Sequence, residues 1–316
     1  MTRAVAFAYH NVGVRCLAVL LAHGVDVVRV VTHRDSPTET IWFDSVAELA
    51  AVHGIPVITP EDPNDPAVLA ELAALQPDLL FSFYYRLMLK APLLALPRQG
   101  AWNMHGSLLP RYRGRVPVNW AIIHGERETG ATLHQMVEKP DAGGIVARQA
   151  VPVLPDDTAL DVFNKVTLAA EMALDRILPD LLAGRAVATP QDLATGSYFG
   201  GRKAEDGRID WTQPAASVHN LIRAVAPPYP GAFADTAKGR LRVLRSLHPS
   251  GETGPYGGQP TLFSHDGRLF AECGDGRLLR LLAVEFNGSP LVSLAAPVTA
   301  SEQFATLLGT PALSLS

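Results

Sequence analysis

The sequence has little cysteine and no long apolar run. Among its 316 residues there are two cysteines, Cys16 and Cys273, which stand far apart. A disulfide framework or a zinc cluster needs several cysteines at short spacings, so neither organises this chain. No segment approaches the ~20 apolar residues of a membrane-spanning helix, and the N-terminus lacks the pattern of a signal peptide. We therefore expect a cytoplasmic protein without a membrane partner.

An excess of positive charge is also missing. The chain has 27 Lys and Arg residues against 31 Asp and Glu residues, a formal net charge of −4. Proteins that bind large nucleic acids are usually basic, because they neutralise phosphates. The balance therefore argues against a nucleic-acid partner. Hydrophobic residues make up 47% of the chain, which suffices for a substantial core. The length indicates two domains, or one large domain with an appendage.

Several common motifs of nucleotide-binding and hydrolytic enzymes are absent. The turn after the first apolar run reads YHNVGVRC, which is not G-x-G-x-x-G, and there is no P-loop lysine motif and no G-x-S-x-G elbow. His105, His124 and His134 lack the spacing of metal ligands. We therefore predict no NAD site and no metal site. The sequence suggests that His124 and His134 are structural or surface residues.

The first half of the chain contains alternating strand-like and helix-like segments. Repeated strand–helix–strand units predict a parallel sheet with helices on both faces, and ligands of such sheets bind beyond the carboxyl ends of the strands. The predicted strands are 4–9, 26–33, 55–59, 78–83 and 144–153, and the predicted helices are 12–23, 44–54, 66–75 and 157–182.

The second half has a different pattern. Residues 188–211 are rich in Gly, Thr and Asp, and we interpret them as a linker with an embedded turn. A short helix is predicted over 214–225. From Gly231 onward, short strand-like runs are separated by Gly, Pro and Asp, which indicates a small antiparallel barrel or sandwich.

Three polar residues between positions 103 and 141 could act together. Asn103 and His105 are two apart after a strand-like run, so their side chains point the same way. A histidine can move a proton near neutral pH, and a carboxylate such as Asp141 would orient the ring and favour its charged form. An amide can stabilise an oxyanion. The set suits acyl transfer, although these residue types also occur as caps of loop amides.

The motifs around these residues resemble those of the formyltetrahydrofolate-dependent formyltransferases. This family includes methionyl-tRNA, glycinamide ribonucleotide and sugar-nucleotide formyltransferases. The resemblance is carried by HGSLLPRYRG, ETGATLHQM and DAGGIVARQ, and it extends to VAFAYHNVG, FGGRKAEDGRIDW and IRAVAPPYPGAF. The segments FSFYYR (81–86) and GRVPVNW (114–120) are most similar to the formyltransferase domain of a bifunctional polymyxin-resistance enzyme. We expect this chain to act without the second, dehydrogenase domain of that enzyme.

The resemblance implies a fold, a domain division and a co-substrate. The expected class is α/β, with a Rossmann-like formyltransferase domain at 1–203 and an OB-like β-barrel subdomain at 204–316. The formyl donor would be N10-formyltetrahydrofolate, and no metal would be needed. Folate and a nucleotide-linked sugar would be the small-molecule partners. The oligomeric state is left open.

The resemblance also implies roles for individual residues. Asn103 matches the residue that stabilises the transition-state oxyanion, His105 the acid/base, and Asp141 the carboxylate that favours the charged histidine. The positions that match folate contacts are Leu87, Met88, Leu89, Arg115, Val137, Glu138, Lys139, Pro140 and Asp141. The chain departs from the pattern at Leu87, where relatives have a polar residue. It departs again at Tyr229, where tRNA-directed members have tryptophan.

The implied reaction is transfer of a formyl group to the amine of a UDP-linked amino sugar. UDP-4-amino-4-deoxy-L-arabinose is the expected acceptor, which connects the reaction to lipid A modification and polymyxin resistance. The alternatives are a methionyl-tRNA formyltransferase, a formyltransferase for another nucleotide-linked amino sugar, and a folate-binding protein without activity. A tRNA acceptor is disfavoured by the net charge and by the lack of a Lys-rich insertion near the site.

Overall fold

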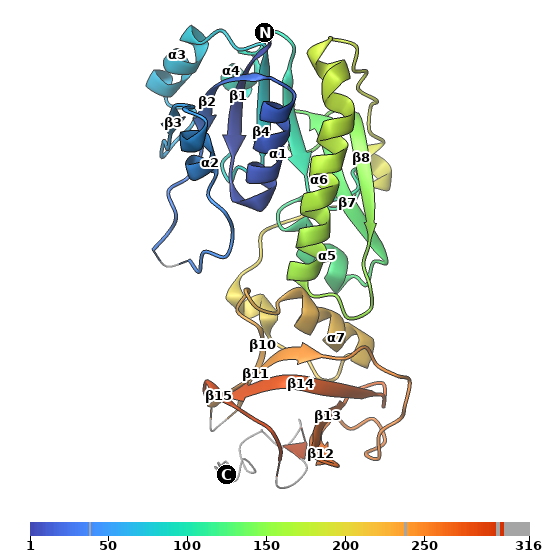
Figure 1. Ribbon diagram of the computed structural model, residues 1–316. Helices are drawn as coiled ribbons and strands as arrows, with labels where there is room; N and C mark the ends of the chain where they lie inside the picture. The colour runs from blue at the N-terminus through green and yellow to red at the C-terminus, as the bar shows by residue number, and fades with distance from the viewer. Residues whose placement is uncertain (38, 237–238, 295–297, 300–316) are drawn as a thin grey trace. The chain divides into compact units, whose positions relative to one another are not determined.

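The computed structural model describes residues 1–37, 39–236, 239–294 and 298–299. The chain forms two compact units (Figure 1). The first comprises Met1–Pro117, Glu128–Pro152 and Phe163–Gly201, and the second comprises Val118–Arg127, Val153–Val162 and the described residues from Arg202 onward. Two short segments from the middle of the chain therefore belong to the second unit by their contacts. The domain boundary at 203/204 stays a prediction.

A seven-stranded mixed sheet, in the order β3-β2-β1-β4-β5-β7-β8, forms the centre of the first unit. The first five of these strands run parallel to one another, whereas β7 runs antiparallel to both β5 and β8. The parallel part of the sheet therefore ends at β5, and the antiparallel part begins with the pairing of β5 and β7. The bounds are β1 (Arg3–Ala8), β2 (Asp26–Val31), β3 (Val57–Ile58), β4 (Leu79–Phe83), β5 (Ala101–His105), β7 (Glu128–Gln135) and β8 (Ile145–Pro152).

Helices cover this sheet because its central strands are apolar on both faces. Every residue of β4 is buried, as expected of a strand enclosed between helices. In the first unit, α1 and the part of α6 from Phe163 onward lie side by side (Figure 1), and an Arg15–Glu171 ion pair joins them. Leu72 of α3 and Leu93 of α4 pack into one core cluster with the strands. The bounds are α1 (His10–Ala22), α2 (Val46–Val52), α3 (Pro66–Ala74), α4 (Ala91–Leu94), α5 (Pro117–Ile123) and α6 (Ala159–Leu182).

Part of the segment predicted as a linker is ordered within the first unit. Strand β9 (Tyr198–Phe199) pairs in parallel with β6 (Arg113–Gly114). The hydroxyl of Ser197 accepts a hydrogen bond from the Tyr112 N–H at 2.8 Å, and the Phe199 carbonyl accepts one from the Arg115 N–H at 2.9 Å. The backbone N–H groups of Tyr112 and Arg115, in the loop after β5, thus find their hydrogen-bond acceptors in the distant segment 197–199. Two 3₁₀ turns, η1 (Leu193–Thr195) and η2 (Ala204–Gly207), flank the strand.

The second unit is built on an antiparallel sheet and one amphipathic helix. The strand order is β10-β11-β14-β13-β12-β16, with β15 paired to β14. Helix α7 (Ala215–Ala224) buries Val218 and Ile222 in the core of this unit. The strands are β10 (Ala232–Thr236), β11 (Gly239–Ser246), β12 (Thr261–His265), β13 (Arg268–Glu272), β14 (Leu278–Phe286), β15 (Ser289–Pro290) and β16 (Val298–Thr299). The predicted α/β class, with a Rossmann-like domain and a C-terminal β subdomain, is confirmed.

Two side chains of α7 attach the 153–162 segment to this second unit. The ring of His219 is fully buried, and its Nε2 donates to the Pro155 carbonyl at 2.9 Å while Nδ1 contacts the Ser246 hydroxyl at 2.8 Å. The Arg223 guanidinium donates to the carbonyls of Leu154 and Asp157. Buried polar groups need such partners, so this segment is held by α7 despite its distance in sequence. Among the helices of the described part of the chain, none is long and apolar enough to cross a membrane.

Candidate active site

Asn103 and His105 lie within β5, whereas the sequence pattern places them after a strand-like run. The reason is that β7 pairs with the end of β5, placing His134 opposite Asn103 and Thr132 opposite His105. The alternation of the strand puts both predicted residues on one face. Their side chains are close to a polar loop, residues 136–144, which connects β7 to β8.

The His105 ring is buried between an acceptor and a carboxylate. Its Nε2 lies 2.8 Å from the Tyr112 carbonyl oxygen. That oxygen can only accept, so Nε2 carries a hydrogen. The other ring nitrogen, Nδ1, faces the Asp141 Oδ1 at 3.5 Å. The Asp141 carboxylate therefore lies where it can hold the orientation of the His105 ring through Nδ1.

The Asp141 carboxylate is ionised at neutral pH. Burial by itself would raise the pKa of Asp141, but the neighbouring His105 ring and the Gly114 N–H hold it well below its ordinary range. The Gly114 N–H donates to Oδ2 at 2.9 Å. The backbone of Asp141 has a positive φ of 53°, which aspartate tolerates better than most residues. An ionised group in a strained loop position, facing a buried histidine, is typical of functional sites.

A glutamine side chain fixes the loop that presents Asp141. The Gln191 Nε2 donates to the Asp141 carbonyl at 3.0 Å and to the Gly143 carbonyl at 2.6 Å. Both ends of the loop are held as well, since the Met136 N–H donates to the Ala101 carbonyl and the Gln135 N–H donates to the Gly144 carbonyl, each at 2.8 Å. The carboxylate is therefore placed by backbone contacts on both sides, which pre-organises the site.

His134 belongs to this cluster, and its interpretation from the sequence as a structural or surface residue missed this. The side chain is 2% exposed, and its Nε2 lies 3.1 Å from the Asn103 amide nitrogen and 3.5 Å from Asp141 Oδ1. The alternating run TGATLHQ could have shown that His134 lies on a strand. The pairing of that strand with β5, which brings His134 to Asn103, is not visible in the sequence.

The predicted folate-binding residues after β4 differ in exposure. Leu87 and Met88 are 39% and 56% exposed, whereas Leu89 is 4% exposed and packs into the core. The Asn64 side chain donates to the Met88 carbonyl at 2.9 Å and accepts from the Lys90 N–H at 2.8 Å. The backbone of this segment, which follows β4, is thereby tied to the loop that precedes α3.

The other predicted folate-binding residues lie in the two loops that meet at Asp141. Arg115 is exposed and follows Gly114, the residue whose N–H donates to Asp141. Val137 is 41% exposed. Glu138 and Lys139 are also exposed, and Pro140 is half-buried next to Asp141. Arg115 therefore follows the residue that binds the Asp141 carboxylate, the 137–141 loop contains that carboxylate, and 87–89 follow β4.

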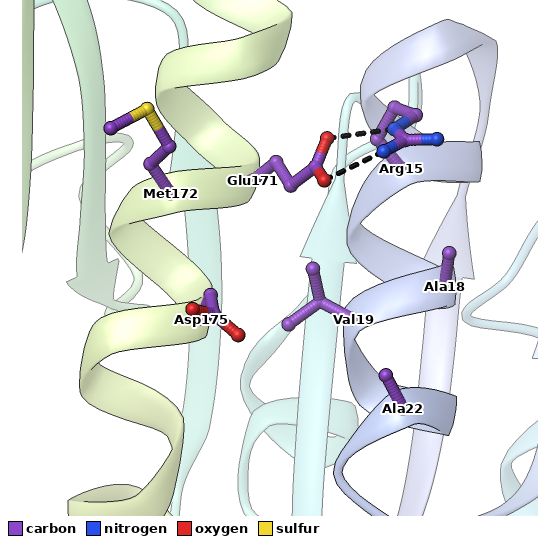
Figure 2. A pocket seen from close by; sticks show the side chains of 7 residues that line it. All are labelled: Arg15, Ala18, Val19, Ala22, Glu171, Met172 and Asp175. Carbon is purple, nitrogen blue, oxygen red and sulfur yellow. Dashed lines mark hydrogen bonds and ion pairs between the residues drawn. The ribbon is translucent and has the colours of Figure 1, made fainter.

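Two further features concern metals and cavities. Within the described ranges, no three or more His, Cys, Asp or Glu side chains lie close enough together to bind a metal ion. A cleft of about 310 Å³ lies between α1 and α6 (Figure 2), and none of the predicted site residues is among its lining residues. An ion pair between Arg15 and Glu171, with N–O distances of 2.7 and 2.6 Å, joins its two walls. Its lining residues are Arg15, Ala18, Val19, Ala22, Glu171, Met172 and Asp175.

Comparison with known protein families accounts for most of the chain. Residues 16–178 match the family model described as formyl transferase, and residues 202–299 match the one described as formyl transferase, C-terminal domain. This chain belongs to the formyl transferase family. The family relationship agrees with the resemblance inferred from the HGSLLPRYRG and DAGGIVARQ motifs.

Solved structures share the fold of this formyl transferase. An N-formyltransferase from Helicobacter canadensis, in complex with folinic acid and dTDP-3-aminofucose, superposes with a TM-score of 0.73 at 21% identity, covering 89% of this chain and 99% of that one. The sugar 3N-formyltransferase WlaRD, with dTDP and 5-N-formyl-THF, gives a TM-score of 0.71 at 19% identity, covering 93% and 99%. HypX from Aquifex aeolicus, in complex with tetrahydrofolic acid, gives 0.62 at 18%, covering 96% of this chain and 46% of HypX.

Proposed function

We propose that this formyl transferase moves the formyl group of N10-formyltetrahydrofolate to the amine of a nucleotide-linked amino sugar. The observation that carries the proposal is the cluster of Asn103, His105 and Asp141 at the end of β5, where the Asp141 carboxylate faces the His105 ring at 3.5 Å. The complexes of the similar structures with folates and with dTDP or a dTDP-sugar support it.

The proposed reaction starts with attack of the neutral sugar amine on the formyl carbon. A new C–N bond forms, and the formyl oxygen becomes an oxyanion. The Asn103 amide is the donor proposed to stabilise this oxyanion, because a neutral amide held on a strand can donate without reorganisation. Collapse of the tetrahedral intermediate breaks the bond between the formyl carbon and N10 of the folate.

His105 is proposed to move the proton that this exchange requires. The attacking nitrogen loses a proton and the departing N10 gains one, so atoms and charge balance over the reaction. With Nε2–H held by the Tyr112 carbonyl, the exchangeable position is Nδ1, beside Asp141. The ionised carboxylate stabilises the transient imidazolium, which makes the histidine an effective acid and base.

The folate is proposed to lie along the two loops and the segment after β4. The backbone of Leu87, Met88 and Leu89 would contact it, since the Leu89 side chain is buried in the core. Arg115 and the 137–141 loop would supply the remaining contacts. The proposed domain division, 1–203 for catalysis and 204–316 for the OB-like subdomain, places all of these residues in the first domain.

The proposed acceptor is UDP-4-amino-4-deoxy-L-arabinose, which would connect this enzyme to lipid A modification. The proposal rests on the resemblance of FSFYYR and GRVPVNW to enzymes that use this sugar. The purified protein should be incubated with N10-formyltetrahydrofolate and, in parallel, with the UDP-sugar, dTDP-3-aminofucose or charged initiator tRNA. Formylation of the UDP-sugar with the highest kcat/KM is expected. Preference for the dTDP-sugar would change the acceptor, and preference for tRNA would refute the sugar assignment.

A further inference from the structure

The hydrogen-bonding pattern around His134 specifies which of its ring nitrogens carries the hydrogen. Nδ1 lies 2.9 Å from the Gln135 carbonyl oxygen, which can only accept. Nε2 lies 3.1 Å from the Asn103 amide nitrogen, which can only donate. Both contacts are satisfied together when Nδ1 carries a hydrogen and Nε2 presents a lone pair.

This pattern has a direct consequence for Asn103. An amide can rotate by half a turn and exchange its oxygen and nitrogen with little change in shape. If Asn103 did so here, its oxygen would face the lone pair of His134 Nε2, and two acceptors would meet in a buried place. The ring is 2% exposed, so water cannot relieve such a contact cheaply. The His134 ring therefore holds the Asn103 amide in one of its two orientations.

The Asp141 carboxylate adds to the need for a correctly oriented ring. Its Oδ1 lies 3.5 Å from His134 Nε2 and 3.5 Å from His105 Nδ1, so it stands between the two imidazoles. A hydrogen bond from the Asn103 amide satisfies the Nε2 lone pair. Without that bond, Nε2 would lack a hydrogen-bond partner unless it carried a hydrogen and donated it to Asp141. Because Asn103 is the partner of His134 Nε2, the Asp141 carboxylate remains available to interact with His105.

We propose that His134 is a positioning residue of the formyl-transfer site. Its Nε2 accepts one hydrogen of the Asn103 amide and so keeps the second hydrogen of the same amide available to an oxyanion. The predicted effect on kinetics rests on the proposed function. The predicted orientation of the Asn103 amide rests only on the contacts of His134. His134 acts through Asn103 and does not touch the reacting atoms.

The kinetic test compares His134→Leu, which removes the acceptor, with His134→Gln, whose side-chain oxygen reaches the position of Nε2. His53→Gln, at an exposed ring that ends α2, is the matched control. We expect His134→Leu to lower kcat on the order of tenfold to a hundredfold, the range for loss of a partner that orients a reacting group. The KM for the formyl donor should stay unchanged, and His134→Gln should recover most of kcat. A glutamine variant as slow as the leucine variant would overturn the proposal.

A double-mutant cycle separates positioning from a general loss of structure. In an Asn103→Ala background there is no amide to orient, so His134→Leu should cause no further loss of kcat. Equal losses in both backgrounds would show that His134 acts independently of Asn103, which would refute the proposal. Thermal unfolding of each variant shows that the comparison is made on folded protein.

A substrate-free measurement keeps the orientation testable even if the acceptor is not an amino sugar. In ¹⁵N NMR spectra of the histidine rings, His134 should show a hydrogen on Nδ1 and none on Nε2, with His134→Gln used to assign its signals. A hydrogen on Nε2 would overturn the Asn103 contact whatever the enzyme formylates. Failure to formylate any sugar, with the expected NMR signals present, would count against the proposed function alone.

Discussion

Replacement of Asp141 by asparagine tests the electrostatic core of the site. The substitution keeps the size of the side chain and an oxygen to accept the Gly114 N–H, but removes the negative charge beside His105. Two unit charges separated by 3.5 Å, the distance from Asp141 Oδ1 to His105 Nδ1, attract by about 5 kcal/mol at an effective dielectric constant of ~20. This energy favours the imidazolium that the proposed reaction forms.

The expected effect on rate follows from that energy. Even half of it, at ~1.4 kcal/mol for each factor of ten, lowers kcat on the order of fiftyfold. The assay is steady-state formylation of the amino sugar at saturating N10-formyltetrahydrofolate, with thermal unfolding as a check on folding. His53→Gln again serves as the matched control. If the kcat of Asp141→Asn stays within about threefold of the wild-type value, the carboxylate does not stabilise a charged His105.

Other predictions concern the donor, the loop and the second unit. Asn103→Ala and His105→Ala should each lower kcat by ~10²–10³ with little change in Tm, as measured by turnover and calorimetry; full activity of both would remove them from the mechanism. Gly143→Ala should lower kcat and destabilise the fold by ~1–3 kcal/mol, since its Cβ would overlap the Gln135 carbonyl oxygen; unchanged kinetics would mean that the loop adapts. Burial lowers the pKa of His219 to about 4. Its stabilising contribution, ~3 kcal/mol, is therefore complete above pH ~6.5 and lost as the pH falls through ~4. Urea unfolding of wild type and His219→Gln at both pH values should show a smaller acid loss in the variant; equal losses would contradict this.

Much of the first unit could be predicted because its elements have local causes. The apolar runs of β1 and β4 are buried on both faces, and period-two alternation places Asn103 and His105 together. Helix α3 begins at Pro66, the predicted position, because the Asp65 side chain caps its first turn. These features depend on residues a few positions apart.

The candidate site depends on contacts between distant segments. His134 reaches Asn103 because β7 pairs with β5 in one register, and a shift by one residue would turn His134 to the other face. Similarly, the 198–199 segment satisfies the loop at 113–115 by strand pairing. Residues 153–162 join the second unit through backbone carbonyls bound by α7. None of these partners is indicated by local pattern.

The sequence by itself determined the class of the fold, the family and the presence of an amide, an imidazole and a carboxylate suited to acyl transfer. Periodicity and short motifs carry that information, because they reflect local backbone geometry and residue chemistry. Only the tertiary structure decided which groups meet: Asp141 between two imidazoles, and His134 against Asn103. Strand register and loop conformation set those distances, and both result from packing across the whole unit.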